Sequence, residues 1–287
     1  MILSVKNVTI NGGERIMKYK LICSDFDGTL LRDDFTVSER DIQSVRDYRK
    51  RGGTFVLLTG RMTKNMDVWA KKLGTLDQPM YVCGFNGGLA IDNGGNEVFS
   101  ETIDFRIAEK IIREAESRGF HVHTYEKDNV LVNKINFIIE EYMRTCNITA
   151  REVGLLSEFV EKNSFNCLKI AIVVAPEKMR QTLSEFIGMN FEGVEFVTSS
   201  GYCIEAVPAS GGKGNALKKI ADYYKIPVSD VIAVGDHRND AGMIREAGLG
   251  CCVANAVEEL KSVADYVSVS NNENAISDII EKFTEER

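Results

Sequence analysis

The sequence predicts an α/β fold, a Rossmann-like, doubly wound parallel sheet with an inserted α+β module. Short apolar runs occur without strict alternation, as in strands that are covered on both faces of a sheet. Helical patterns stand between or after these runs, which is typical of parallel α/β sheets. The middle of the chain departs from this order. Buried strands are expected at 20–23, 55–58, 80–83, 231–234 and 251–253.

The first helix has clear start and stop signals. Ser38 is suited to cap it, with Asp41 three positions on, and the helix should run to Arg51 because Gly52 follows as a stop. Ligands of open α/β sheets bind beyond the carboxyl ends of the strands, so functional residues are expected there. Further helices are expected at 62–73, 214–224, 239–247 and 272–283.

Residues 98–207 read as a separate α+β module, because an amphipathic helix at 105–118 is followed by alternating strand patterns. The strands are expected at 120–125 and 168–174, with a strand pair around 195–198 and 202–205. We therefore predict a core of residues 17–97 and 208–287. Residues 1–16 read as an N-terminal extension, with Met17 as a candidate native start.

Composition and charge restrict the classes of function. The 287 residues suggest about two domains, and 44% hydrophobic with 27% charged residues is typical of a soluble globular protein. The net charge of -7 opposes binding to nucleic acid or to an anionic membrane, but allows a small phosphorylated metabolite. The absence of a long apolar run or secretory signal, together with seven scattered cysteines, predicts a cytoplasmic protein. The oligomeric state stays open.

Two carboxylates directly follow the first predicted strand. Asp25 and Asp27 stand two positions apart in extended chain and should project to the same side, while Gly28 allows a sharp turn. Like charges this close require a cation or a shared proton, which suggests a hard divalent metal. The alternative is a capped turn with two exposed acids.

Two further segments offer groups for a phosphoryl oxygen. Thr59, Gly60 and Arg61 follow the second strand and supply a hydroxyl and backbone amides near a helix start. Lys213 lies within Gly211-Gly212-Lys213-Gly214 at another helix start, without the spacing of a P-loop. By itself this second segment reads equally well as a surface turn with a solvated lysine.

Gly235-Asp236-His237-Arg238-Asn239-Asp240 follows the strand at 231–234. Asp236 and Asp240 add two carboxylates at the same edge of the predicted sheet. With Asp25 and Asp27 they would form an acidic cluster that is unstable without a metal. One metal ion therefore accounts for both pairs.

The ordered set Asp-x-Asp-Gly-Thr, Thr-Gly-Arg, Gly-Lys-Gly and Gly-Asp-x-x-Asn-Asp resembles the four motifs of the haloacid dehalogenase (HAD) superfamily. Asn86-Gly87-Gly88 and 253–256 match details of its Cof-type (IIB) sugar-phosphatase branch. The resemblance covers 17–99 and 208–287 and implies a HAD core with a C2B-type cap at the place of the α+β module. His237 and Arg238 depart from the usual pattern, which leaves the local shape and the substrate preference open.

The resemblance implies a Mg²⁺-dependent phosphatase, a phosphoric monoester hydrolase that acts on sugar phosphates or similar metabolites. Asp25 would be the nucleophile and Asp27 the acid and base, with Thr59 and Lys213 holding the phosphoryl group. Asp25, Asp27 (through its backbone carbonyl), Asp236 and Asp240 would bind the metal. Further contacts to phosphate or substrate are expected from Gly28, Gly60, Arg61, Asn86, Gly87 and Asn239.

Two other functions compete with this interpretation. A phosphomutase related to phosphomannomutases would keep the phosphoryl group on its product, and a catalytically silent regulator would only bind a phosphorylated ligand. Four intact acids argue against the regulator, because binding alone needs no nucleophile. In the cap, His121, His123, Arg144 and Lys169 are candidates for substrate contact, although the two histidines more simply read as ordinary sheet residues.

Overall fold

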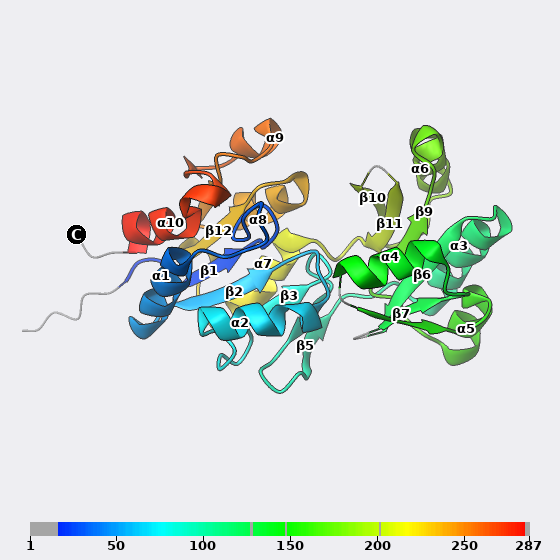
Figure 1. Ribbon diagram of the computed structural model, residues 1–287, viewed down its shortest axis with the longest axis horizontal. Coiled ribbons are helices and arrows are strands. Elements are labelled where there is room, and N and C mark those ends of the chain that lie inside the picture. The colour runs from blue at the N-terminus through cyan, green and yellow to red at the C-terminus, as the bar shows by residue number, and fades with distance from the viewer. Residues whose placement is uncertain (1–16, 127–128, 147, 201, 285–287) are drawn as a thin grey trace, which may run out of the picture.

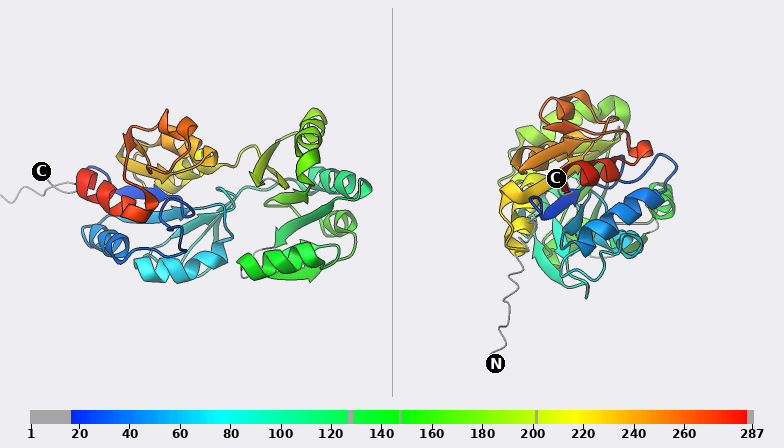
Figure 2. Two further views of the ribbon diagram at one scale, coloured as in Figure 1. Left: turned by 45° about the horizontal axis from the view of Figure 1, so that its top comes forward. Right: turned by 90° about the vertical axis from the view of Figure 1, so that its left-hand side faces the viewer.

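The computed structural model describes residues 17–126, 129–146, 148–200 and 202–284. It contains two β-sheets, each with its own helices, which form two lobes (Figure 1). The chain leaves the first lobe and returns to it later, so two connecting segments, 101–104 and 209–212, join the lobes (Figure 2). The predicted fold class is confirmed. The predicted extension, 1–16, lies outside the described residues.

The first sheet has eight strands in the order β14-β13-β12-β1-β2-β3-β4-β5. Its strands are parallel except for β4 and β5, which extend one edge as antiparallel strands. From β1 the chain builds outward through β2, and it later returns to the other side of β1 at β12, which makes β1 the switch point of the sheet. The strands are β1 (Leu21–Ser24), β2 (Thr54–Leu58), β3 (Val82–Gly84), β4 (Leu89–Ile91), β5 (Glu97–Ser100), β12 (Val231–Gly235), β13 (Leu249–Cys252) and β14 (Tyr266–Val267).

Helices cover both faces of this sheet. Ile22 and Leu57 pack into the core under one helix layer, whereas Leu21 and Val56 pack under the other. Because successive side chains of a strand point to opposite faces, the apolar runs without alternation serve both layers. The first layer is α1 (Glu39–Lys50), α2 (Asp67–Leu73) and α10 (Ala275–Thr284), and the second is α7 (Lys213–Tyr223), α8 (Ala241–Glu246) and α9 (Glu258–Lys261).

Local signals explain how these helices begin. Ser38 caps α1 as predicted, because its side chain accepts a hydrogen bond from the Asp41 N–H. The helix predicted at 272–283 begins later, at Ala275, because Asn274 has a φ of 68° and interrupts the helical path. Single 3₁₀ turns stand before other elements: η1 (Thr63–Met66), η2 (Pro176–Lys178), η3 (Val228–Asp230), η4 (Arg238–Asp240) and η5 (Asn271–Glu273).

The second sheet has six strands in the order β10-β11-β9-β6-β7-β8, all antiparallel to their neighbours except β7 with β8. Its strands are β6 (His121–Glu126), β7 (Asn129–Val132), β8 (Thr149–Glu152), β9 (Ile170–Val173), β10 (Val194–Ser200) and β11 (Cys203–Pro208). The helices α3 (Phe105–Ser117), α5 (Leu156–Asn163) and α6 (Met179–Gly188) pack on one face, and α4 (Phe137–Cys146) covers part of the other. The sequence patterns did not predict β7, β8 or α4–α6.

The partly open face of the second sheet is turned toward the first lobe. Side chains of both lobes line one cleft of about 2540 Å³. Phe85 after β3 contacts Tyr125 of β6, with 5.3 Å between the ring centroids. The strand β5 spans the predicted domain boundary at 97/98 and pairs with β4 in the first sheet. In the part of the chain that the structure describes, no helix is long and apolar enough to cross a membrane.

Candidate active site

The site lies at the carboxyl end of β1. Ser24 and Val234 are register partners in the parallel strands β1 and β12, so the residues after them emerge side by side. The Asp25 N–H donates to the Val234 carbonyl at 2.9 Å, and Asp236 follows one residue after β12. Parallel pairing thus brings together two acids that are separated by about 200 residues of chain.

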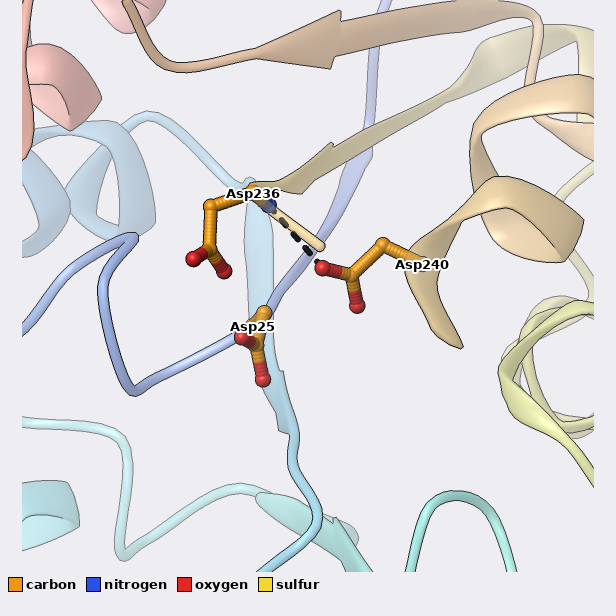
Figure 3. A group of neighbouring side chains, drawn as sticks. All are labelled: Asp25, Asp236 and Asp240. Atoms are coloured by element: carbon orange, nitrogen blue, oxygen red, sulfur yellow. Dashed lines mark hydrogen bonds between the residues drawn. The ribbon is translucent and has the colours of Figure 1, made fainter. Parts of the chain in front are cut away.

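Three carboxylates converge at this point. Asp25, Asp236 and Asp240 each offer an oxygen, and the three oxygens lie within 4.8 Å of one another (Figure 3). Burial, followed by the charges of Asp240 and Asp236, raises the pKa of Asp25 well above its usual value. Burial and the charge of Asp240 likewise raise the pKa of Asp236. The cluster therefore needs positive charge nearby to hold its acids ionised.

Lys213 supplies one such charge. It is the first residue of α7, its side chain is fully buried, and its Nζ donates to Asp25 Oδ1 at 2.5 Å and to Asp240 Oδ1 at 2.6 Å. Burial alone lowers the pKa of Lys213, but Asp240 and Asp25 outweigh it and raise this pKa above its usual value. The alternative interpretation of Lys213 as a solvated surface lysine is wrong.

Asp240 uses both of its oxygens. Besides Lys213, it binds the backbone of the preceding loop, because Oδ2 accepts hydrogen bonds from the N–H groups of Asp236 and His237, each at 2.9 Å. Its side chain is completely buried. Asp240 therefore holds the loop after β12 and positions the Lys213 ammonium beside Asp25.

Asp27 lies apart from the three-carboxylate cluster. Its exposed carboxylate accepts hydrogen bonds from Arg61 Nε at 2.8 Å and Nη2 at 2.5 Å, and the Arg61 guanidinium also lies 4.9 Å from the centre of the Phe26 ring. Such a bidentate pair fixes the orientation of a carboxylate. Asp25 and Asp27 both line the cleft, but only Asp25 belongs to the cluster.

The loops after β2, β3 and β12 are joined to one another. Thr59 is buried, and its Oγ1 accepts a hydrogen bond from the Arg61 N–H at 3.1 Å. The Asn86 N–H donates to the Thr59 carbonyl, while Asn86 Oδ1 accepts from Asn239 Nδ2, each at 2.9 Å. Asn86 also faces Gly60, where a Cβ would lie 3.1 Å from its Oδ1. Four of the predicted phosphate-binding residues thus line the same cleft as Asp25: Gly60, Arg61, Asn86 and Asn239.

Two glycines allow the motif loops to approach one another closely. Gly28 has a φ of 74°, and a Cβ at this position would lie 2.5 Å from Asp236 Oδ2. Gly87 has a φ of 99°, and a Cβ there would lie 2.7 Å from the carbonyl oxygen of Gly212. A side chain at either place would be strained and would push the motif loops apart.

Sequence reasoning gave no individual role to some residues of the site. Thr29 Oγ1 donates to Asp236 Oδ1 at 3.1 Å, and Asn255 Nδ2 donates to the Gly28 carbonyl at 2.8 Å. Glu205, in the second lobe, was missed although it is buried on β11 and lines the cleft. The available signal was a charged residue flanked by Ile204 and Ala206 in an otherwise apolar strand.

The residues present fit a hard divalent cation. Three carboxylates converge against a single buried ammonium, so the cluster has a deficit of positive charge when its acids are ionised. Its donors are all oxygens, which is the ligand set that Mg²⁺ prefers. The arrangement therefore has the charge and the donor chemistry to hold a divalent metal ion.

The fold and the site define a two-lobed α/β protein with a cluster of three carboxylates at the switch point of its core sheet. Residues 22–280 match the model of the haloacid dehalogenase-like hydrolase family, so the chain belongs to this family and to its Cof-type branch. The predicted family is confirmed.

Several relatives cover nearly the whole chain. The Bacillus subtilis protein YwtE, named 5-amino-6-(5-phospho-D-ribitylamino)uracil phosphatase, is 27% identical over 92% of this chain and 97% of its own. Phosphatase YwpJ of the same organism is 26% identical over 90% and 97%. A solved Thermotoga maritima structure superposes with a TM-score of 0.83 at 26% identity, covering 93% of this chain and 98% of that one.

Proposed function

We propose that the protein is a Mg²⁺-dependent phosphatase that hydrolyses small phosphorylated metabolites, such as sugar phosphates or similar phosphomonoesters. The observation that carries this proposal is Asp25, a buried carboxylate held by Lys213 within a three-carboxylate cluster that opens to a cleft. The phosphatase names of relatives that match over nine-tenths of the chain support the same reaction class.

The chemistry follows from the positions of two acids. In the first step an Asp25 oxygen attacks phosphorus and forms an aspartyl-phosphate, while Asp27 gives a proton to the departing alcohol oxygen. In the second step Asp27 takes a proton from water, which attacks the aspartyl-phosphate and releases inorganic phosphate. The bidentate contact with Arg61 orients the ionised carboxylate of Asp27, the form that takes the proton from water.

Positive charge around Asp25 makes the attack on an anionic ester feasible. Lys213 offsets the charge of Asp25, and Thr59, with the amides of the surrounding glycines, faces the phosphoryl oxygens. Asp25, Asp236, Asp240 and the Asp27 backbone carbonyl would hold Mg²⁺, which when bound neutralises charge on the transferred phosphoryl group.

The second lobe, from α3 to β11, would act as the cap and the substrate-specificity domain; it begins later than the predicted residue 98, because β5 belongs to the first sheet. Its cleft-facing sheet lies opposite the motif loops, a position from which a cap limits access of water and selects the leaving group. Five cysteines are buried free thiols, which supports a cytoplasmic location: Cys23, Cys83, Cys167, Cys251 and Cys252.

The test is phosphate release from a panel of phosphorylated metabolites, with Mg²⁺ and with EDTA. Release should require Mg²⁺ and should be lost in Asp25→Asn, whereas the exposed-surface control Asp222→Asn should retain it. Equal release by the parent and Asp25→Asn would exclude the covalent mechanism. Transfer of the phosphoryl group to a second position of the sugar, without free phosphate, would identify a phosphomutase instead.

A further inference from the structure

The second sheet presents a polar face to the cleft. On β6, β9 and β11 the even-numbered residues, such as Val122, Ile172 and Ile204, pack under the helices of the lobe. The odd-numbered residues line the cleft instead. They include His121, His123, Tyr125, Lys169 and Glu205.

A buried ion pair stands at the centre of this face. Lys169 Nζ donates to Glu205 Oε1 at 2.7 Å, and each of the two side chains is only 7% exposed. The Lys169 ammonium also lies 5.0 Å from the centre of the Tyr125 ring. Since an ammonium has three donors, this pair leaves hydrogen-bonding capacity on Lys169. Glu205 Oε2 is buried and has no hydrogen-bond partner within the described protein.

The neighbouring histidines repeat this pattern. His123 Nε2 is 3.2 Å from the Tyr125 hydroxyl, but the buried Nδ1 has no partner, and the same is true of His121 Nε2. Over the described residues, four buried side-chain nitrogen or oxygen atoms lack a partner, and three of them are on this face. Because an unsatisfied buried polar atom costs free energy, their concentration in one cleft indicates a ligand.

The charge of the face restricts this ligand. Burial lowers the pKa of His121, and burial with the charges of His121 and Lys169 lowers the pKa of His123 to about 3, so both imidazoles are neutral near pH 7. Lys169 and Glu205 cancel each other. An anionic group placed here would face the free oxygen of Glu205 and the exposed carboxylate of Glu195, which also lines the cleft.

We propose that Lys169 and Glu205, with His123 beside them, form a leaving-group site that selects phosphomonoesters of uncharged polyhydroxylated alcohols, that is, polyols or sugars. One hydroxyl donates to Glu205 Oε2 and a neighbouring hydroxyl accepts from Lys169. The inference rests on the proposed function, because it assigns the phosphoryl end of the same substrate to Asp25.

The experiment compares kcat/KM for three kinds of ester with six carbons: hexose and hexitol 6-phosphates, n-hexyl phosphate and 6-phosphogluconate. The best polyol or sugar ester should be preferred over hexyl phosphate by at least about 100-fold, because a site built for hydroxyls rejects analogues that lack them. 6-Phosphogluconate, which adds a carboxylate, should be disfavoured relative to the same ester. A parent enzyme without preference for hydroxylated esters would overturn the inference.

Glu205→Gln tests the assigned group. It should lower the preference for the polyol or sugar ester over hexyl phosphate by about 10- to 100-fold, the range for loss of a hydrogen bond to a charged group. Glu185→Gln is the matched control, because Glu185 of α6 pairs with Arg118 at the end of α3 and is not part of the cleft lining. The preference should be unchanged in this control.

A purely structural role for the pair is tested with a second variant. Removing one member of a buried ion pair destabilises a protein, whereas replacing both by apolar residues is often neutral. Lys169→Met combined with Glu205→Leu should therefore fold and should bring the preference for hydroxylated esters close to one. If this double variant keeps the preference of the parent, the assignment is wrong.

A binding measurement separates this inference from the proposed function. Calorimetric titration of the same esters into Asp25→Asn protein, with and without Glu205→Gln, needs no turnover. Absence of turnover for every ester would refute the phosphatase, while tighter binding of hydroxylated esters that depends on Glu205 would still support the site. Turnover with equal affinity for all three esters would refute the site alone.

Discussion

Lys213→Met should destabilise the first lobe because it removes the only buried ammonium from the described acidic cluster. The lysine forms two ion pairs with the buried carboxylates of Asp25 and Asp240, at 2.5 and 2.6 Å. Removing one partner of a buried ion pair typically costs about 3–5 kcal/mol. We expect a loss of this size in EDTA at pH 8, or a decrease in Tm of about 6–20 °C.

The measurement is urea unfolding followed by the fluorescence of Trp69, the single tryptophan of the chain. Trp69 packs against Phe26, with 5.2 Å between the ring centroids, so it reports on the first lobe separately from the second. The control is Lys218→Met on the same helix, because Lys218 pairs with Glu246 at 2.8 Å and the two side chains are 46% and 43% exposed. Its loss should cost less than about 1 kcal/mol.

The penalty should depend on pH in a defined direction. Asp25 has a raised pKa in the folded protein, and loss of Lys213 raises it further, since Lys213 is the charge that lowers it. A carboxyl group whose pKa is higher folded than unfolded destabilises the protein at pH values above the unfolded pKa, about 3.9. The difference between the variant and the parent should therefore grow from pH 5 to pH 8. A difference below about 1 kcal/mol at pH 8 would refute the reasoning.

Three further substitutions have separate expected outcomes. Arg61→Lys should lower kcat about 10- to 100-fold in the phosphatase assay, because lysine cannot form the bidentate contact with Asp27; unchanged kcat would show that Asp27 needs no such partner. Gly28→Ala should lower both turnover and Tm, since its Cβ would lie 2.5 Å from Asp236 Oδ2 at a φ of 74°, and wild-type values for both would contradict the close approach. Ser38→Ala should cost about 1 kcal/mol in urea unfolding through loss of a helix cap, with turnover unchanged.

The central part of the site could be predicted from local sequence. Asp25, Thr59 and Asp236 each follow an apolar run, and the carboxyl ends of parallel strands meet at one edge of a sheet. A residue just beyond such a strand is therefore near its counterparts whatever the length of chain between them. The glycines at 28 and 87 were likewise visible, and the structure adds what each one approaches.

Contacts between particular side chains were harder to predict from the sequence. Asp27 is two positions from Asp25, yet it is oriented by Arg61 from another loop, while Asp25 is held by Lys213. Spacing along the chain predicts the side of the backbone to which a side chain points, but not which of several nearby cations pairs with it. The pairing depends on how far each loop extends beyond the ends of the strands.

The sequence by itself determined the α/β class, the edge of the sheet where the site lies and the residues of the motif loops, because these depend on strand patterns and on residues adjacent to strand ends. Only the tertiary structure decided the cleft face of the second lobe. Lys169 and Glu205 are separated by 36 positions and meet because β9 and β11 are neighbours in a sheet whose order does not follow the chain. Antiparallel pairing leaves many orders open, and the choice among them depends on how the helices and strands pack together.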